Sequence, residues 1–369
     1  MGELAKRVVV KVGSSTIGAE DGGLDTEFLR GLIAQVAELR SAGCETVVVS
    51  SGAVAAGIAA LKLARRPVEM PELQAAAAAG QVRVISTYAE LFAEAGMTVA
   101  QVLLTRHDVS HRQQYLYACR TFERLLAMGA VPVVNENDTT AVDEIRFGDN
   151  DTLAALVGIM VKADLVVMLT DIEGLYSADP RTSGQARLLT HVAEVTEAML
   201  EAASGPGSEV GTGGMATKVE AARTLMKAGI PMVVCEARRP RVVVDAAEGK
   251  PVGTYFAGGD AELASRKLWI AFGRAPVGSV TIDDGAREAL CLRGKSLLPA
   301  GVVEVTGDFV PGDTVALHDR AGNVIARGLT AISSAELRRV KGMRSADIAR
   351  VLPDHAGVEV VHRDSLVIL

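Results

Sequence analysis

Two lysines in glycine- and serine-rich surroundings are the side chains of this sequence best suited to chemistry on phosphate groups. Lys11 stands in an apolar, β-branched run, residues 8–12, which gives way to Gly13, Ser14 and Ser15. Such a run is typical of a buried strand in a parallel sheet, and ligands bind at the ends of these strands. Small residues let backbone N–H groups approach a phosphate closely, with Lys11 as the positive charge beside it. The alternative is an ordinary strand and turn whose lysine reaches solvent.

Lys218 ends a second glycine-rich segment, residues 211–218, which we expect to open a helix. Glycines at a helix N-terminus leave N–H groups and the positive end of the helix dipole directed at an anion. Because Lys218 is followed by Val219, the segment does not fit the P-loop pattern G-x-x-x-x-G-K-[ST], and a P-loop nucleotide hydrolase is excluded. A flexible glycine-rich loop before a helix is the alternative.

Polar clusters follow other predicted strands. Residues 50–53 (SSGA) form a small-residue turn whose N–H groups and hydroxyls suit an anion or a carboxylate. Residues 135–138 (NEND) and 149–151 (DND) bring together carboxylates and amides, which suit an ammonium group, a magnesium ion or another polar ligand. Asn150 could instead simply cap the helix that follows it.

The two lysines, which we expect at opposite ends of one sheet edge with acids between them, favour phosphoryl transfer. That reaction needs positive charge and in-line positioning more than it needs a covalent nucleophile. His107, His111 and His191 have no paired nucleophile in the sequence, so a Ser-His-Asp arrangement is not supported.

Strand and helix patterns alternate over the first 240 residues or so. The predicted strands span residues 8–12, 46–50, 99–104, 131–134, 165–169 and 232–235. The predicted helices span residues 26–42, 71–95 and 113–128, two more end at Met160 and Ala228, and residues 139–147 form a loop or short hairpin. This alternation predicts an α/β three-layer sandwich with a mostly parallel sheet and right-handed crossovers.

From about Gly278 the pattern changes to short strands separated by Gly, Pro and Asp turns, which indicates a small β-barrel-like domain. Its predicted strands span residues 279–282, 301–305, 314–317, 324–327, 358–361 and 366–368. We therefore expect a catalytic domain at 1–266, a linker at 267–277 and a second domain at 278–369.

Composition excludes several function classes. The net charge of −7 gives no general reason to expect nucleic acid or an anionic membrane as a partner. No segment approaches the ~18 apolar residues that a membrane span needs, and the N-terminus lacks a cleavable signal. The four cysteines lie far apart, so a zinc site or disulfide framework is not expected. A soluble cytoplasmic protein is the expectation.

Six motifs that follow one another along the chain resemble those of the amino-acid kinase family, most closely the members that phosphorylate glutamate for proline synthesis. They are VVKVGSS (9–15), SSGAVAAG (50–57), PVVNEND (132–138), FGDND (147–151), LTDIEGLY (169–176) and GTGGMATK (211–218). The later segment GKSLLPAG (294–301) is similar to the PUA domain that many of these enzymes carry. The resemblance covers nearly the whole chain and implies the amino-acid kinase fold followed by a PUA domain.

The resemblance also implies a reaction and a set of site residues. ATP, accompanied by Mg²⁺, would give its γ-phosphoryl group to the side-chain carboxylate of L-glutamate. The catalytic residues would be Lys11 and Lys218, with Asp151 holding both in place, and no metal-ligating residue is expected. The substrate-binding residues would be Ser51, Gly52, Ala53, Asp138 and Asn150. The nucleotide-binding residues would be Lys11, Gly13, Thr170, Asp171, Thr212, Gly213, Gly214, Met215, Ala216, Thr217 and Lys218.

Partners follow from the same resemblance: proline as an inhibitor, a homodimer or homotetramer, and the downstream glutamyl phosphate reductase. Kinases of N-acetylglutamate or aspartate are the nearest alternatives, since they would share the lysines and differ around Ser51 and residues 135–138.

An RNA-binding or regulatory module is the alternative from another class. However, residues 276–369 hold 11 Lys and Arg against 12 Asp and Glu, a net charge of −1. Arg338, Arg339, Lys341 and Arg344 cluster, but a solvated helix face explains them, and RNA is not expected as a partner.

Overall fold

The chain forms two compact units, Met1–Glu262 and Leu263–Leu369. The computed structural model describes residues 4–19, 23–105, 108–109, 112–140, 150–178, 184–204, 214–259, 276–343, 345–351 and 359–368. The predicted loop or hairpin at 139–147 and the predicted linker at 267–277 lie largely outside these ranges. The domain boundaries therefore stay predictions.

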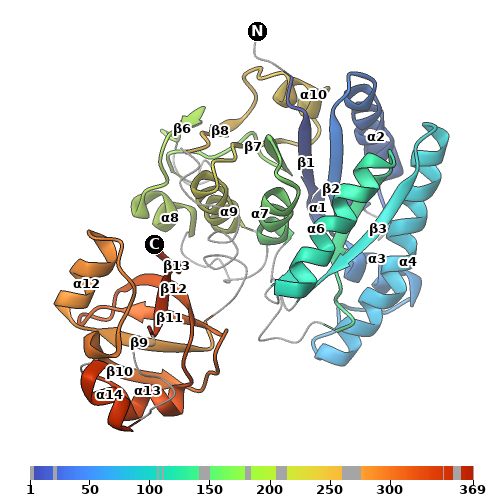
Figure 1. The fold of residues 1–369 in the computed structure, drawn as a ribbon. Coiled ribbons are helices and arrows are strands. Elements are labelled where there is room, and N and C mark those ends of the chain that lie inside the picture. The colour runs from blue at the N-terminus through green and yellow to red at the C-terminus, as the bar shows by residue number, and fades with distance from the viewer. Residues whose placement is uncertain are drawn as a thin grey trace. The chain divides into compact units, whose positions relative to one another are not determined.

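The first unit is built on an eight-stranded sheet with the order β3-β4-β2-β1-β5-β7-β8-β6 (Figure 1). The strands are β1 (Arg7–Val12), β2 (Glu45–Val49), β3 (Val99–Leu104), β4 (Val131–Glu136), β5 (Leu165–Thr170), β6 (His191–Val192), β7 (Met232–Glu236) and β8 (Thr254–Phe256). Neighbouring strands pair in parallel, apart from the antiparallel pair of β7 and β8. The predicted mostly parallel sheet is confirmed.

Helices cover both faces of this sheet (Figure 1). They are α1 (Ser14–Ile17), α2 (Thr26–Ser41), α3 (Ala53–Ala60), α4 (Met70–Glu94), α6 (Arg112–Ala127), α7 (Asn150–Val161), α8 (Glu197–Ser204), α9 (Met215–Lys227) and α10 (Val242–Ala247). On one face α2, α4 and α10 share a hydrophobic core with alternate residues of the strands. On the other face α6, α7 and α9 pack against β4, β1, β5 and β7. The predicted three-layer fold class is confirmed.

Local signals explain where these helices begin and end. The side chain of Asp25 accepts a hydrogen bond from the Phe28 N–H at 2.9 Å and so caps α2. Gly43, with φ +86°, follows its last turn. Helices α1, α3, α8 and α10 were not predicted. All four have eight residues or fewer, too few to establish a helical period in the sequence.

Helices α3 and α4 contact each other backbone to backbone. A Cβ atom on Gly57 would lie 1.7 Å from the Ala76 carbonyl oxygen, and one on Gly80 would lie 1.8 Å from that of Ala53. Glycine is therefore required at both crossing points. This close contact places the middle of α4 beside the turn at residues 50–53.

The second unit contains a five-stranded sheet with the order β10-β9-β11-β12-β13. Its strands are β9 (Gly278–Ile282), β10 (Val302–Gly307), β11 (Thr314–His318), β12 (Val324–Thr330) and β13 (Val361–Ile368). Its helical segments are α12 (Asp284–Cys291), η2 (Pro299–Gly301), α13 (Ser334–Val340) and α14 (Ser345–Val351). The sheet has its own hydrophobic core, separate from that of the first unit.

Two details of the predicted strands are wrong. The last strands, predicted as 358–361 and 366–368, belong to one strand, because the pairing of Val361 with β12 resumes at Leu366 after a register shift that accommodates the exposed polar residues 362–364. Strand β4 continues through Asn135 and Glu136, whose backbones pair with Leu103 and Leu104, although their side chains are polar. No helix in the described part of the chain combines the length and hydropathy that a membrane span requires.

Candidate active site

Lys11 is a buried lysine on the face of the sheet that α7 and α9 cover. Side chains alternate between the two faces of a strand, and Val8, Val10 and Val12 belong to the core beneath α2, α4 and α10. Lys11 therefore faces the opposite helices, α7 and α9. Only 3% of its surface is exposed, so the alternative in which it reaches solvent is wrong.

Asp151 joins the two lysines. It is the second residue of α7 and is fully buried. The Lys11 Nζ lies 2.5 Å from its Oδ1, and the Lys218 Nζ lies 3.1 Å from its Oδ2. The lysines thus meet at one carboxylate, and the prediction that they stand at opposite ends of the sheet edge is wrong. Buried charges persist only when they are paired and hydrogen-bonded, and here one carboxylate pairs with two ammonium groups.

The start of α9 positions the second lysine. Gly214 precedes α9 in an extended conformation, Met215 and Ala216 form its first residues, and Lys218 lies in its first turn. The Thr217 Oγ1 lies 2.8 Å from Asp151 Oδ2 and 2.7 Å from the Gly214 carbonyl oxygen. Since a hydroxyl has one proton, Thr217 donates to one of these acceptors at a time. The predicted nucleotide-binding residues Thr212 and Gly213 lie outside the described residues.

The tight turns that follow β1 and β2 lie next to each other. Gly13 begins α1, and a Cβ atom on it would lie 3.7 Å from the Lys11 Nζ, so this turn sits directly beside the buried ammonium group. Gly52 begins α3 with φ +90°, a conformation that favours glycine, and a Cβ there would lie 2.7 Å from Ile17 Cδ1. Ala53, the next residue, is buried.

Asn150, the first residue of α7, is a donor across the site. Its Nδ2 lies 2.5 Å from the Ser50 carbonyl oxygen, 3.0 Å from Ser51 Oγ and 2.8 Å from Asn135 Oδ1. These contacts tie α7 to the turn after β2 and to β4. The two N–H hydrogens of this amide are thus shared among three acceptors on other elements. The structure brings together the predicted substrate residues Ser51 and Asn150.

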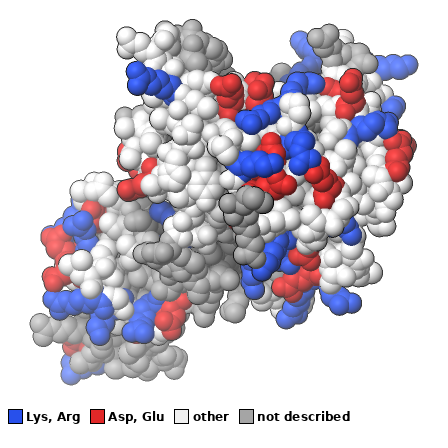
Figure 2. Space-filling model, turned by 90° about the horizontal axis from the view of Figure 1, so that it is seen from above, with Lys and Arg blue, Asp and Glu red and all other residues white. Residues whose placement is uncertain are grey.

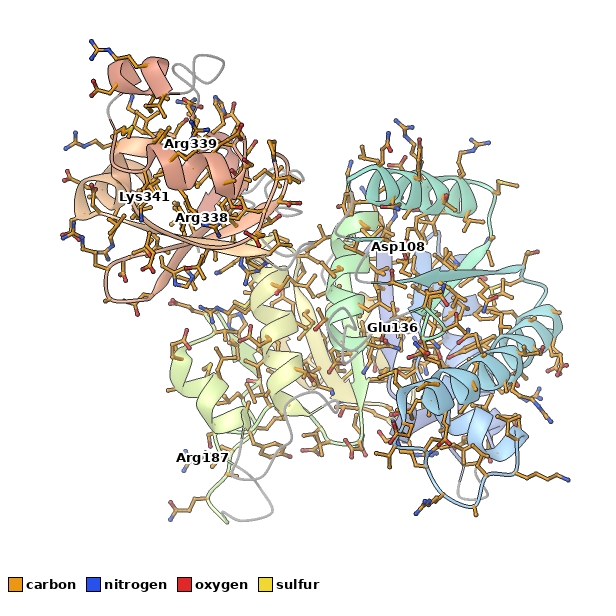
Figure 3. All side chains as sticks on the ribbon, turned by 90° about the horizontal axis from the view of Figure 1, so that it is seen from below. Asp108, Glu136, Arg187, Arg338, Arg339 and Lys341 are labelled. Carbon is orange, nitrogen blue, oxygen red and sulfur yellow. The ribbon has the colours of Figure 1, made fainter. Side chains whose placement is uncertain are left out.

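The remaining predicted residues lie along the same edge. Asp138 is half-buried in the turn that follows β4, close to Glu136, the last residue of that strand, which Figure 3 labels at this edge. Thr170 is the last residue of β5, and its hydroxyl lies 3.0 Å from Asp171 Oδ1. Thr170 is buried and Asp171 is exposed. Asp149 lies outside the described residues.

Comparisons with known proteins identify the family of the chain. A model of the amino acid kinase family matches residues 6–236, and one of the PUA domain matches residues 278–352. The chain belongs to the amino acid kinase family.

Within the family, curated relatives named glutamate 5-kinase match almost the full chain. One from Geobacter sp. (strain M21) is 48% identical over 364 residues, which cover 99% of this chain and 98% of the relative. One from Streptomyces coelicolor is 48% identical over 369 residues, with 99% and 97% covered. One from Caldanaerobacter subterraneus is 44% identical over 363 residues, with 98% of both covered. The chain is therefore a kinase of this family with a C-terminal PUA domain.

The fold is also found among solved structures. That of UMP kinase from Bacillus anthracis matches with a TM-score of 0.50 and 15% sequence identity, covering 71% of this chain and 99% of the other. At this identity the match concerns the fold alone.

This family member holds site residues that the predicted set did not include. Gln81 and Tyr88 of α4 contact β4 and the residue that follows β2. The Gln81 Oε1 accepts from Asn135 Nδ2 at 2.8 Å, and the Tyr88 hydroxyl lies 3.2 Å from Ser50 Oγ. Full burial raises the pKa of Tyr88 to about 12. The sequence signal that could have linked Gln81 and Tyr88 was their spacing, because residues seven apart lie on one face of a helix.

In the PUA unit, the basic cluster lies in and just after α13 (Figure 3). Arg338 forms an ion pair with Asp308 at 3.1 Å and donates to the Gly307 carbonyl oxygen at 2.5 Å. On the face drawn in Figure 2, Lys and Arg are interspersed with Asp and Glu. Arg344 lies outside the described residues, and the expectation about RNA stays a prediction.

Metal ligands and thiols are the remaining reactive groups. No set of three His, Cys, Asp or Glu side chains in the described ranges is placed to hold a metal ion. Cys44 and Cys235 are buried, and burial raises the pKa of Cys44 to about 11 and that of Cys235 to about 12. Cys291 is exposed.

Proposed function

We propose that this kinase transfers the γ-phosphoryl group of ATP to the side-chain carboxylate of L-glutamate, which yields L-glutamyl 5-phosphate in proline synthesis. The observation that carries the proposal is the pair of buried lysines on Asp151, next along α7 to Asn150 and its contact with Ser51. The names of the full-length relatives support glutamate as the acceptor.

The charged side of the site supplies the transfer chemistry. A transferring phosphoryl group carries negative charge on its oxygens, and catalysis consists mainly of positioning and charge stabilisation. Lys11 and Lys218 would provide that stabilisation from two elements, β1 and α9. Asp151 would keep both ammonium groups in place, because removing it would leave two like charges buried side by side.

The neutral side supplies the acceptor site. Ser51 Oγ lies 3.0 Å from Asn150 Nδ2, which can only donate, so the single proton of Ser51 is not used in this contact and can be donated to a substrate carboxylate. Asn150 uses its Nδ2 within the protein, so its remaining polar atom is Oδ1, an acceptor that suits an ammonium group. Asp138 would add a negative charge for the same ammonium group, and Gly52 and Ala53 would line the turn.

The nucleotide would lie on the side of β5 and α9, with Thr170, Asp171 and the segment from Thr212 to Lys218 around it. The N–H groups at the start of α9 have no acceptor within the helix and suit phosphate oxygens. Mg²⁺ would arrive with ATP, since it neutralises the β- and γ-phosphates.

The proposal extends to regulation and setting. Proline would inhibit the enzyme, which would act in the cytoplasm as a homodimer or homotetramer and pass its labile acyl phosphate to the glutamyl phosphate reductase. Analytical ultracentrifugation, with and without that reductase, tests both assembly statements.

The decisive experiment measures ADP release from ATP and Mg²⁺ with L-glutamate, N-acetylglutamate or L-aspartate, each with and without proline. We expect turnover with L-glutamate and its suppression by proline. Turnover with N-acetylglutamate or aspartate in place of glutamate would contradict the assignment of L-glutamate as the substrate. Glutamate turnover unaffected by proline would remove only the feedback inhibition.

A further inference from the structure

The acceptor side of the site is held by a chain of neutral hydrogen bonds that begins on α4. Gln81 Oε1 accepts from Asn135 Nδ2 at 2.8 Å, and Asn135 Oδ1 accepts from Asn150 Nδ2 at 2.8 Å. The same Asn135 Oδ1 accepts from the Glu136 backbone N–H at 2.9 Å. Asn135 and Asn150 are 3% and 9% exposed, so water does not readily replace these partners.

The donor and acceptor roles in this series of hydrogen bonds are fixed at both ends. The Glu136 N–H can only donate, so the Asn135 atom facing it must be its oxygen. The Ser50 carbonyl oxygen can only accept, so the Asn150 atom facing it must be its nitrogen. With its oxygen committed, Asn135 has only Nδ2 left to bond, and Gln81 supplies the acceptor for it.

The fold explains why Gln81 reaches this position. Gly80 lets α4 approach the Ala53 carbonyl oxygen so closely that any side chain would clash. The next residue, Gln81, therefore lies beside the β2 turn and β4, and Tyr88, two turns later, reaches Ser50 Oγ from the same helix. Helix α4 thus contributes two polar contacts to an acceptor site whose other residues come from β2, β4 and α7.

We propose that Gln81 is a positioning residue for the amino-acid acceptor, which acts through Asn135 to fix the side-chain amide of Asn150. With that amide fixed, Asn150 Nδ2, a donor only, stays beside Ser51 Oγ, so the Ser51 proton points away from Asn150. Asn150 Oδ1 then keeps its direction as an acceptor. Gln81 itself does not touch the reacting atoms. This inference rests on the proposed role of Ser51 and Asn150 in binding glutamate.

The first test is the kinetic effect of Gln81→Met in the full-length enzyme, since methionine keeps the length of the side chain and removes the acceptor. We expect the KM for glutamate to rise about 3–30-fold, with kcat within about twofold and the KM for ATP unchanged. Gln81→Glu, which keeps an accepting oxygen, should lie closer to the wild type than Gln81→Met. Gln114→Met, the same change at an exposed position of α6, is the matched control.

The second test asks whether Gln81 acts through Asn150. In an Asn150→Ala background, Gln81→Met should change the KM for glutamate by less than about twofold, because the amide that it positions is gone. A merely structural role would give the same factor in both backgrounds. If the KM of the double variant rose by the product of the two single effects, the proposal would be overturned. An unchanged glutamate KM in Gln81→Met alone would also overturn it.

The two proposals can fail separately. If the wild type does not use glutamate, the proposed function fails. The double-mutant cycle of Gln81→Met and Asn150→Ala can then be measured as the free energy of unfolding of the wild type, the two single variants and the double variant, which needs no substrate. Coupled losses of stability would support the link from Gln81 through Asn135 to Asn150. Additive losses would overturn it whichever acid the enzyme phosphorylates.

Discussion

Two consecutive residues of α7 contact the two halves of this site. One half is held by ion pairs and the other by hydrogen bonds between neutral groups. Asp151 enters a group of three ions, in which Lys11 and Lys218 are 3% and 5% exposed and the aspartate is fully buried. Asn150 enters a network of amides and hydroxyls in which the residues bonded to its amide are neutral, with Asp138 proposed as a counter-charge beside them. We call these the charged half and the neutral half.

The difference follows from what each half would have to bind. Negative charge on a transferring phosphoryl group requires fixed positive charge, which a buried site can keep only around a shared counter-ion. An amino acid carries both signs of charge, and a directed set of donors and acceptors can bind it without a strong field. The neutral half therefore depends on the direction of each hydrogen bond, whereas the charged half depends on charge balance.

The largest expected effect comes from Asp151→Asn, which keeps the shape of the side chain and removes the shared negative charge. We expect kcat to fall about 10²–10³-fold and the free energy of unfolding to fall by about 3–5 kcal/mol, because two buried ammonium groups lose the negative charge that they share. Kinetics and denaturant unfolding measure both. Asp245→Asn, which removes an exposed 3.0 Å ion pair with Lys250, should cost less than about 1 kcal/mol. Equal losses in the two variants would contradict the account.

Lys218→Met tests the charged half without leaving two like charges. Asp151 keeps Lys11 as its partner, so we expect a smaller loss of stability than in Asp151→Asn. The rate should still fall about 10²–10³-fold, since one of the two positive charges on the phosphoryl group is gone. A normal kcat in this variant would show that Lys218 has no role in transfer.

Ser51→Ala is the corresponding change in the neutral half. Loss of one hydrogen bond to a charged substrate group should raise the KM for glutamate about 10–100-fold, with a far smaller effect on kcat than in Lys218→Met. The KM for ATP serves as the internal control. A fall in kcat with an unchanged glutamate KM would mean that the halves are not separate.

The smallest effect is expected for Tyr88→Phe, whose hydroxyl supports Ser50. We expect a loss of about 1 kcal/mol at pH 8. Because burial raises the pKa of Tyr88 to about 12, the neutral phenol stabilises the wild type fully below pH 10, and this contribution is lost as pH rises from 10 to 12. The stability gap between wild type and variant should therefore narrow and then reverse over that range in denaturant titrations, because a two-unit difference in pKa corresponds to more than about 1 kcal/mol. At pH 8, replacement of the exposed Tyr117 by Phe should cost far less stability than Tyr88→Phe.

The charged half was largely predictable from the sequence, whereas the neutral half was predictable only in part. The valine run before Lys11 and the glycines before Lys218 are local signals that each mark a strand or a helix start. Their meeting at Asp151 was available only through the family resemblance, because nothing local indicates that two lysines share a carboxylate.

Gln81 could not have been predicted in the same way. It follows an alanine-rich stretch, and its contact with Asn135 joins residues 54 positions apart. That contact depends on the glycine-mediated crossing of α3 and α4, which is a property of the packed fold. The fold class was nevertheless predictable, since alternating strand and helix patterns are repeated along the first unit and leave few arrangements open.

The most direct test of the two-half account is a calorimetric titration of L-glutamate into Lys218→Met and into Ser51→Ala, without nucleotide. The account predicts that Lys218→Met binds glutamate within about threefold of the wild-type Kd, while Ser51→Ala binds it at least about tenfold more weakly. If Lys218→Met lost glutamate binding as severely as Ser51→Ala, acceptor binding would depend on the charged half as well, and the division proposed for this site would be contradicted.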